Sequence, residues 1–387
     1  MNRCGRNVAW LVLSVCLVAC TTPQPQESSL SAARDIGAKT TTTPPREPRS
    51  PFSSREFEAF QAAVDKAEEI DNLTERCFAY PDPPGSHWSR DAVIAYCRYR
   101  LQPTLDYSFV VDAIDRKRAV EIDSAFDELV KQNLGTLRPQ ETIWRSMIEN
   151  FQDSSTQLRH ITDDWKQQSP HSALAYTASA FVYERMAGNA RGSDWSSNTP
   201  QANIDAMHTL LISARADLAK AVEIDPSLTT PYALMVNVGV LDGDPAYADQ
   251  GIRRGLAVDP ASFAIYDVLT MAAMPRWGGS RERQQELVKS AETQAAKNPL
   301  LLTIRANVLV DVYGLRTCSC QTAAERAAYR EVFDQVATAR DLLGAGENAK
   351  KHHQPELAYV YLSEALRFYP MDDVRQDRQA VMAELAL

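Results

Sequence analysis

Apolar positions recur along most of this 387-residue chain at spacings of three and four residues, which is the period of an amphipathic α-helix. The first such stripe covers about residues 55–71, and others follow it to the end of the chain, separated by prolines and glycines. Almost no segment alternates apolar and polar residues with period two, as a half-buried strand would. The pattern therefore predicts an all-α fold.

One helical pattern repeats at a fixed distance. Before both Pro226 and Pro260 lie an aspartate, a small residue five positions back, an aliphatic residue eight back and an alanine twelve back. The two prolines are 34 residues apart, and a period of this length indicates stacked two-helix units. The same three offsets precede Pro370. Predicted helices in this part of the chain include 231–241, 245–258, 261–273, 282–296 and 323–343.

These offsets resemble those of the tetratricopeptide repeat family. The resemblance implies a right-handed α-solenoid of helix hairpins, with a concave surface suited to a peptide or a partner's helix. The turn Pro275-Arg-Trp-Gly-Gly-Ser280 is similar to one in a bacterial tetratricopeptide-like domain of unknown function, over about residues 165–313, and this likeness implies no activity. Before Pro170 the period is not readable, which leaves either degenerate repeats or a separate helical cap.

The start of the chain resembles a bacterial lipoprotein signal. Two arginines precede an apolar run of about a dozen residues, which suits a secretory segment and is short for a membrane span. The run ends Leu17-Val-Ala-Cys20, similar to a lipobox, and this implies cleavage before Cys20 and its lipidation. No aspartate follows Cys20, as in lipoproteins forwarded to the outer membrane. The alternative is an ordinary signal peptide.

After Cys20 the composition separates a polar stretch from the helical body. The stretch after Cys20 is rich in Thr, Pro, Ser and Gln and cannot bury enough apolar surface to fold. We therefore predict four parts: a signal peptide (1–19), the lipidated Cys20 with a disordered linker (20–55), an N-terminal helical region (56–169) and tetratricopeptide-like repeats (170–387). The linker would tether the folded body to the membrane.

Charge narrows the class of partner. The formal net charge is −9, and loss of the two arginines in the signal would make it more negative by two. An acidic exported body is a poor match for nucleic acid or for an anionic membrane surface. We expect a protein or peptide partner in the cell envelope, and membrane attachment through Cys20 alone.

Four cysteines follow the signal and Cys20, and in an oxidising compartment an even number indicates disulfides. Three pairings are possible. We favour Cys77 with Cys97, a bridge that the chain-entropy model gives about 3 kcal/mol. This leaves Cys318 and Cys320, which are separated by one residue and could form a reducible pair.

Few residues carry a signal for chemistry. Arg276 and Trp277 are candidate partner-binding residues, because Arg and Trp dominate interface hot spots; the alternative is that Trp277 fills a gap between helix pairs. Residues 344–349 fit the Gly-x-Gly-x-x-Ala pattern of dinucleotide folds, but no strand precedes them, so we interpret them as a turn between helices. The six histidines are scattered, and we assign no catalytic residue, no metal ligand and no cofactor.

The function that these expectations favour is a lipid-anchored scaffold or accessory subunit at the outer membrane, facing the periplasm. Two alternatives belong to other classes. One is a thiol–disulfide protein that uses Cys318 and Cys320, and the other is an enzyme with its active site in the solenoid groove.

Overall fold

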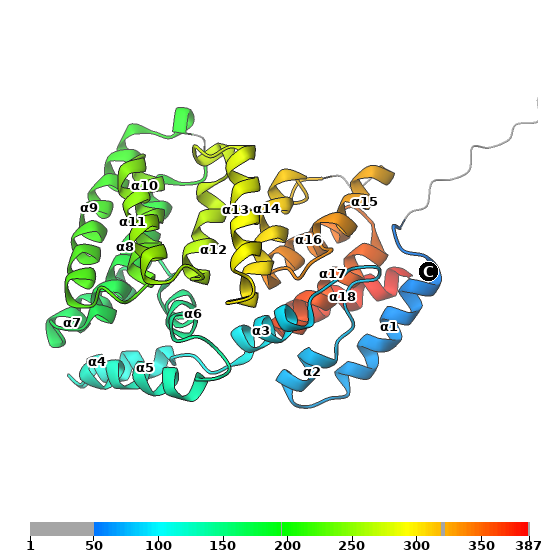
Figure 1. Ribbon diagram of the computed structural model, residues 1–387, viewed down its shortest axis with the longest axis horizontal. Coiled ribbons are helices and arrows are strands. Elements are labelled where there is room, and N and C mark those ends of the chain that lie inside the picture. The colour runs from blue at the N-terminus through cyan, green and yellow to red at the C-terminus, as the bar shows by residue number, and fades with distance from the viewer. Residues whose placement is uncertain (1–49, 195, 319–321, 386–387) are drawn as a thin grey trace, which may run out of the picture. The chain divides into compact units, whose positions relative to one another are not determined.

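Caps and prolines in the sequence decide where the helices begin and end. The computed structural model describes residues 50–194, 196–318 and 322–385, and in these ranges every regular element is a helix (Figure 1). The all-α prediction is thus confirmed for the described residues. In chain order the helices are α1 (Ser54–Glu68), α2 (Leu73–Ala79), α3 (Arg90–Leu101), α4 (Tyr107–Asp115), α5 (Val120–Asn133), α6 (Pro139–Phe151), α7 (Thr156–Gln168), α8 (Ala173–Arg191), η1 (Ser196–Asn198), α9 (Gln201–Ile224), α10 (Thr230–Asp242), α11 (Pro245–Val258), α12 (Phe263–Ala272), η2 (Pro275–Trp277), α13 (Arg281–Gln294), η3 (Pro299–Leu302), α14 (Thr303–Val312), α15 (Ala323–Val332), α16 (Ala339–Lys351), α17 (Pro355–Phe368) and α18 (Asp372–Leu385), the η elements being short 3₁₀ helices.

Helices that are neighbours in sequence pack against each other. From α7 onward, α8 packs on α9, α10 on α11, α16 on α17, and α17 on α18. First helices of successive pairs also touch, since α10 contacts both α8 and α12. The predicted boundary at residues 169 and 170 falls between α7 and α8, which are themselves in contact within one compact unit, Glu47–Leu387.

Small residues allow the close approach that the repeat pattern requires. Gly255, five positions before Pro260, lies against α12 and α10: an added Cβ would come within 2.6 Å of Ile265 Cδ1 and 3.0 Å of Tyr232 Cβ. Asp225 and Asp259 end α9 and α11 in extended conformations, as a following proline demands.

Three sequence expectations need correction. Residues 323–343 do not form one helix, because α15 ends at Val332 and a new helix begins after the capping residue Thr338. Residues 344–349 lie inside α16 rather than in a turn, and Gly346 is there because a Cβ would come within 2.8 Å of the Leu362 side chain on α17. The folded body also begins earlier than residue 56: Phe52 is buried, and Ser53 starts α1 through a capping box with Glu56.

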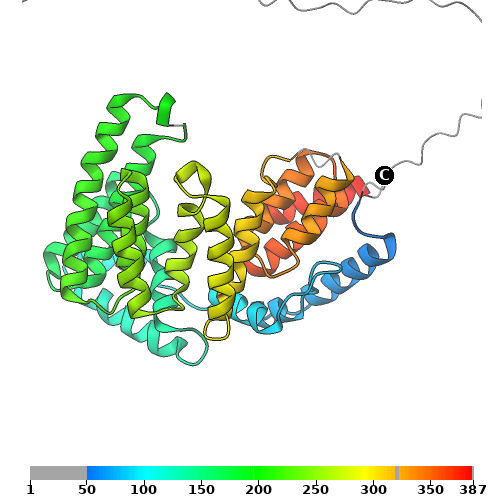
Figure 2. The same cartoon turned by 45° about the horizontal axis from the view of Figure 1, so that its top comes forward.

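Helices from opposite ends of the sequence lie side by side. Figures 1 and 2 show α1, α2 and α3 (blue to cyan) beside α17 and α18 (orange to red), and all three N-terminal helices contact α17. Every residue of α17 from Leu357 to Phe368 is buried. The side chain of Glu68 accepts hydrogen bonds at 2.8 and 2.9 Å from Arg378 of α18. The N-terminal helices therefore supply part of the cover for the C-terminal core.

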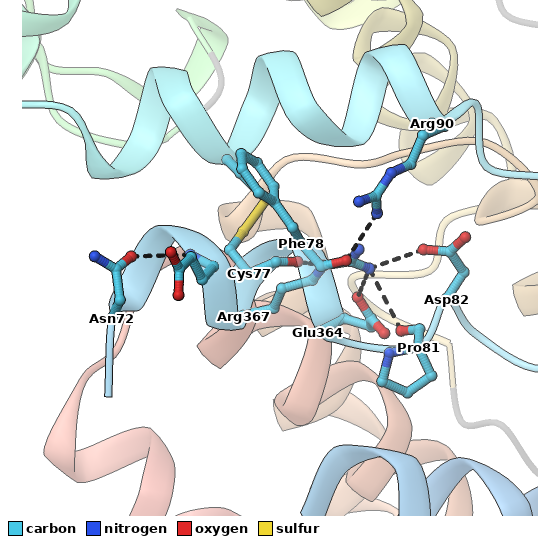
Figure 3. Close-up of a disulfide and its surroundings, with 10 residues drawn as sticks. Asn72, Cys77, Phe78, Pro81, Asp82, Arg90, Glu364 and Arg367 are labelled. Atoms are coloured by element: carbon cyan, nitrogen blue, oxygen red, sulfur yellow. Dashed lines mark hydrogen bonds and ion pairs between the residues drawn. A yellow bond between two sulfur atoms is a disulfide. The ribbon is translucent and has the colours of Figure 1, made fainter. Parts of the chain in front are cut away.

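The disulfide predicted between Cys77 and Cys97 lies at this junction. The two sulfur atoms are 2.04 Å apart and join α2 to α3. Beside them, Arg367 of α17 donates from Nε to the Cys77 carbonyl at 2.8 Å and from Nη1 to Asp82 Oδ1 at 2.9 Å (Figure 3). Glu364, fully buried, accepts from the same Nη1 at 3.1 Å. One buried guanidinium thus fixes the disulfide segment to the C-terminal helices.

A second buried acid, Glu141, connects α6 to the repeats. Its Oε1 accepts a hydrogen bond from the backbone N–H of Phe263, the first residue of α12, at 3.2 Å, and another from Asn298 Nδ2 at 2.7 Å. Arg138, at the start of α6, donates to the Ala261 carbonyl and to Asp259, each at 2.7 Å. Burial raises the pKa of Glu141 to about 8, against the opposing effects of the Phe263 hydrogen bond and the Arg138 charge.

We expect Glu141→Gln to remove part of the pH dependence of stability. The carboxyl group titrates near 4.5 in its usual environment and near 8 when folded. Between these values the folded chain keeps a proton that the unfolded chain has released, so the free energy of unfolding falls as pH rises, by about 1.4 kcal/mol per pH unit. Glutamine resembles the protonated acid at every pH. In denaturant titrations the variant should match the wild type near pH 4 and be more stable at pH 8.

Glu128→Gln, at an exposed site on α5, is the matched control and should follow the wild-type pH profile. Glu364 is also buried with its pKa raised to about 8, so a residual slope should persist in Glu141→Gln. Parallel profiles for the wild type and Glu141→Gln would contradict the effect of burial at Glu141.

Candidate functional site

The turn that follows α12 folds back on the end of that helix. Gly279 donates its backbone N–H to the Met274 carbonyl at 3.0 Å, and Gly278 has a φ of 86°, which favours glycine. A Cβ on Gly279 would lie 2.0 Å from the Ala273 carbonyl oxygen. The two glycines therefore let the chain reverse tightly, and the reversal places Trp277 beside the helices rather than in solvent.

Trp277 lines a cleft of about 430 Å³. The walls come from α6, α8, α10, α12 and α16 together with η2, so the cleft is assembled from residues between Trp144 and Arg340. Ligand sites in proteins commonly have volumes of about 300–1,000 Å³. The cleft is large enough for several side chains of a peptide.

Aromatic side chains form the apolar part of this cleft. Trp144 and Phe181 are buried and pack together with ring centroids 6.1 Å apart. Trp277 is half-buried, and its ring has the Arg191 guanidinium at 5.2 Å and that of Arg276 at 5.3 Å. Trp277 therefore has one part of its ring system at the cleft wall and is flanked by cations.

Polar groups lie among these rings. Glu184 is buried, and burial raises the pKa of its carboxyl group; the Arg185 guanidinium, with Nε 2.8 Å from Oε2, opposes the shift. Burial likewise raises the pKa of Asp267, opposed by the charge of Arg340. The buried Oδ1 of Asn237 has no hydrogen-bond partner among the described residues. The cleft thus combines aromatic walls with groups able to donate and accept hydrogen bonds.

Arg340 also lines a second cleft, of about 250 Å³. Tyr96 and Arg100 of α3, Leu343 of α16 and Tyr369 form much of its wall. Tyr369 is exposed, and the Arg100 guanidinium lies 4.7 Å from the centre of its ring. Two adjoining clefts, each with aromatic side chains, therefore meet at one arginine.

The residues that the sequence singled out occupy different positions in the structure. Trp277 lines the first cleft, whereas Arg276 is exposed, stacks on the Trp277 ring and is not part of the lining. Cys318 lies near α15 and α16, with Sγ 3.8 Å from Tyr329 Oη and 3.4 Å from Asn348 Nδ2. Cys20 and Cys320 lie outside the described residues.

Other cleft residues carry no signal in the sequence. Glu184, Asp267 and Arg340 lie within ordinary helical segments, and only the packing of five helices brings them together. A charged residue on the apolar face of a helix is the feature that could have indicated Glu184, which follows the buried Phe181 and Val182.

Two features are absent from the residues that the structure describes. None of the helices there has the length and apolar character needed to cross a membrane. No group of three or more His, Cys, Asp or Glu side chains is arranged to hold a metal ion in the same part of the chain.

The fold and the clefts define an all-helical protein with a ligand-sized cleft beside a glycine-containing turn. Residues 244–305 match the model of a domain of unknown function, DUF4034. The matched segment covers α11, α12, the Pro275–Ser280 turn and α13, so this part of the chain is similar to that domain. A comparison with curated proteins found no match.

We expect Gly279→Ala to displace the turn and lower stability. The added methyl group would overlap the Ala273 backbone, which cannot move as a flexible side chain would. Overpacking of this kind typically costs about 1–3 kcal/mol. The near-ultraviolet circular dichroism of the tryptophans should change together with the midpoint of thermal unfolding.

Gly344→Ala provides the control, since no atom lies within 4 Å of the added Cβ and the site is inside α16. This variant should be as stable as the wild type or more stable, by up to about 1 kcal/mol. If Gly279→Ala unfolds like Gly344→Ala and keeps the wild-type spectrum, the tight reversal at Gly279 is not required.

Proposed function

We propose that this chain is a lipoprotein of the bacterial cell envelope that binds a peptide segment of a protein partner. Cys20 carries the lipid and holds the protein at the outer membrane, facing the periplasm, and the residues before α1 form the tether. The helical body is a tetratricopeptide-like solenoid, and its task is binding rather than catalysis. The helix pairs α8–α9, α10–α11 and α16–α17 and the recurring Asp-Pro ends support the solenoid.

The observation that carries the proposal is the position of Trp277. Its half-buried ring lies at the wall of a cleft of about 430 Å³ that also contains Trp144, Phe181 and the amide of Asn237. Buried aromatic groups supply most of the binding energy in such sites, and a few amide and charged groups orient the ligand.

Site-specific crosslinking in cells tests this function. A photoreactive phenylalanine at Gln152, an exposed residue of the cleft lining, should crosslink to one defined envelope protein. The same probe at Ile212, exposed on α9 and outside the lining, should not give that product. Trp277→Ala should reduce the crosslinked product about tenfold or more, the usual effect of removing an aromatic hot spot.

Tyr107→Ala, which removes an exposed aromatic residue on α4, is the matched control and should leave the crosslink unchanged. Equal products from Gln152 and Ile212, or a crosslink that is insensitive to Trp277→Ala, would count against binding in this cleft.

Membrane attachment has its own test. The wild-type protein should incorporate labelled palmitate and begin at residue 20 by mass spectrometry. Cys20→Ser should take up no label and keep its first 19 residues, because the thioether cannot form. Cys16→Ser, within the same signal, should behave like the wild type. Labelling of the Cys20→Ser protein, or a mature wild-type chain of unmodified mass, would refute the anchor.

A further inference from the structure

Arg340 occupies a position shared by the two clefts. It is the second residue of α16, is exposed, and lines both the cleft of about 430 Å³ and the cleft of about 250 Å³. Its backbone is fixed on either side. The N–H of Ala339 donates to the buried Tyr96 hydroxyl at 2.8 Å, and Asp341, also buried, accepts from Thr338 Oγ1 at 2.7 Å. A well-held backbone therefore presents a long cationic side chain where the clefts meet.

The guanidinium group of Arg340 is not engaged by a neighbouring carboxylate. Within the ranges that the structure describes, it makes no ion pair at 4 Å or less and no hydrogen bond. The half-buried Asp267 interacts with the Arg340 charge only at longer range. Two other arginines of the clefts have carboxylate partners, since Arg185 lies 2.8 Å from Glu184 and Arg100 lies 3.7 Å from Glu149. The third, Arg191, donates to the backbone carbonyls of Gly192 and Asp194, each at 3.0 Å.

Both clefts beside Arg340 contain apolar and aromatic side chains. Trp144, Phe181 and Trp277 line one cleft. Tyr96, Leu343, Tyr369 and Met371 line the other. A ligand that fills both clefts would pass over Arg340, and there a negative group would gain charge-assisted hydrogen bonds in a fork geometry that suits carboxylates.

We propose that the partner segment carries an internal Asp or Glu side chain, flanked on both sides by apolar residues, and that this carboxylate binds Arg340. The proposal rests on the proposed function and names the chemistry of its ligand. A cationic segment is disfavoured because Arg340, Arg185 and Arg191 face it against the two acids Glu184 and Asp267. Each flanking apolar side chain takes one of the two clefts.

Binding to two matched peptides tests the proposal. The full-length protein is titrated with an acetylated, amidated dodecapeptide in which a central Glu is flanked on each side by Leu and Phe, with Gly and Ser elsewhere. The second peptide has Gln in place of Glu. Amidation leaves the Glu side chain as the only carboxylate. The Glu peptide should bind about tenfold more tightly than the Gln peptide, as expected for a charge-assisted hydrogen bond.

Arg340→Gln should reduce this ratio to about one, and Arg340→Lys should leave an intermediate value because it keeps the charge but loses the fork. Arg253→Gln removes an equal charge from an exposed site on α11 and should preserve the tenfold preference. Circular dichroism confirms that each variant is folded. A ratio near one in the wild type, or a preserved ratio in Arg340→Gln, overturns the proposal.

The results separate this proposal from the proposed function. If both peptides bind the wild type equally and Trp277→Ala weakens both, the cleft binds peptides but Arg340 does not select a carboxylate. If neither peptide binds, the carboxylate proposal is overturned, and the crosslinking from Gln152 decides the proposed function independently.

Discussion

The carboxyl group of Glu141 joins parts of the chain that are far apart in sequence, and it holds together two helices that line the cleft beside Trp277. Through Oε1 it holds the start of α12, 122 residues away, and the Asn298 side chain. This contact sets α6 and α12 beside each other near their N-terminal ends. Trp144 and Ile148, farther along α6, then line the same cleft as Asp267 and Met271, farther along α12. The contact at Glu141 thus helps to hold two of the cleft walls together.

Burying the Glu141 carboxyl group costs free energy, and its hydrogen bonds fix how α6 and α12 are aligned. Burial opposes ionisation, which is why the pKa of Glu141 is raised to about 8. An apolar residue would avoid this penalty, but apolar contact is not directional and would allow α6 to slide along α12. Two hydrogen bonds to one oxygen atom specify a single register. Arg367 and Glu364 have the same effect at the other end of the body, where they fix the disulfide segment against α17 (Figure 3).

Local signals in the sequence predicted most of the helices but failed between residues 323 and 349, and they did not predict the site. The offsets before Pro226 and Pro260 predicted the ends of α9 and α11, and the spacing of Cys77 and Cys97 favoured their pairing, because both depend on nearby residues. The contact between Glu141 and Phe263 joins residues that are 122 positions apart in the sequence. No local sequence pattern encodes such a contact. The same holds for Arg340, which looks like any exposed helical arginine until α3 and α12 are placed beside it. Trp277 could be singled out because Trp and Arg dominate interface hot spots and it follows Arg276 in a glycine-containing turn.

The electrostatics of the body and of the clefts act over different distances. The whole chain is acidic, with a formal net charge of −9, so it weakly repels an acidic partner at long range. At physiological ionic strength this repulsion is screened beyond about 8 Å. A segment bound in the clefts would displace water from around Arg340, and the interaction between Arg340 and a carboxylate would then be less screened. Association with an acidic segment would then be slow to begin but specific once apolar side chains enter both clefts. Selection would come from the fit around one arginine rather than from the overall charge of the protein.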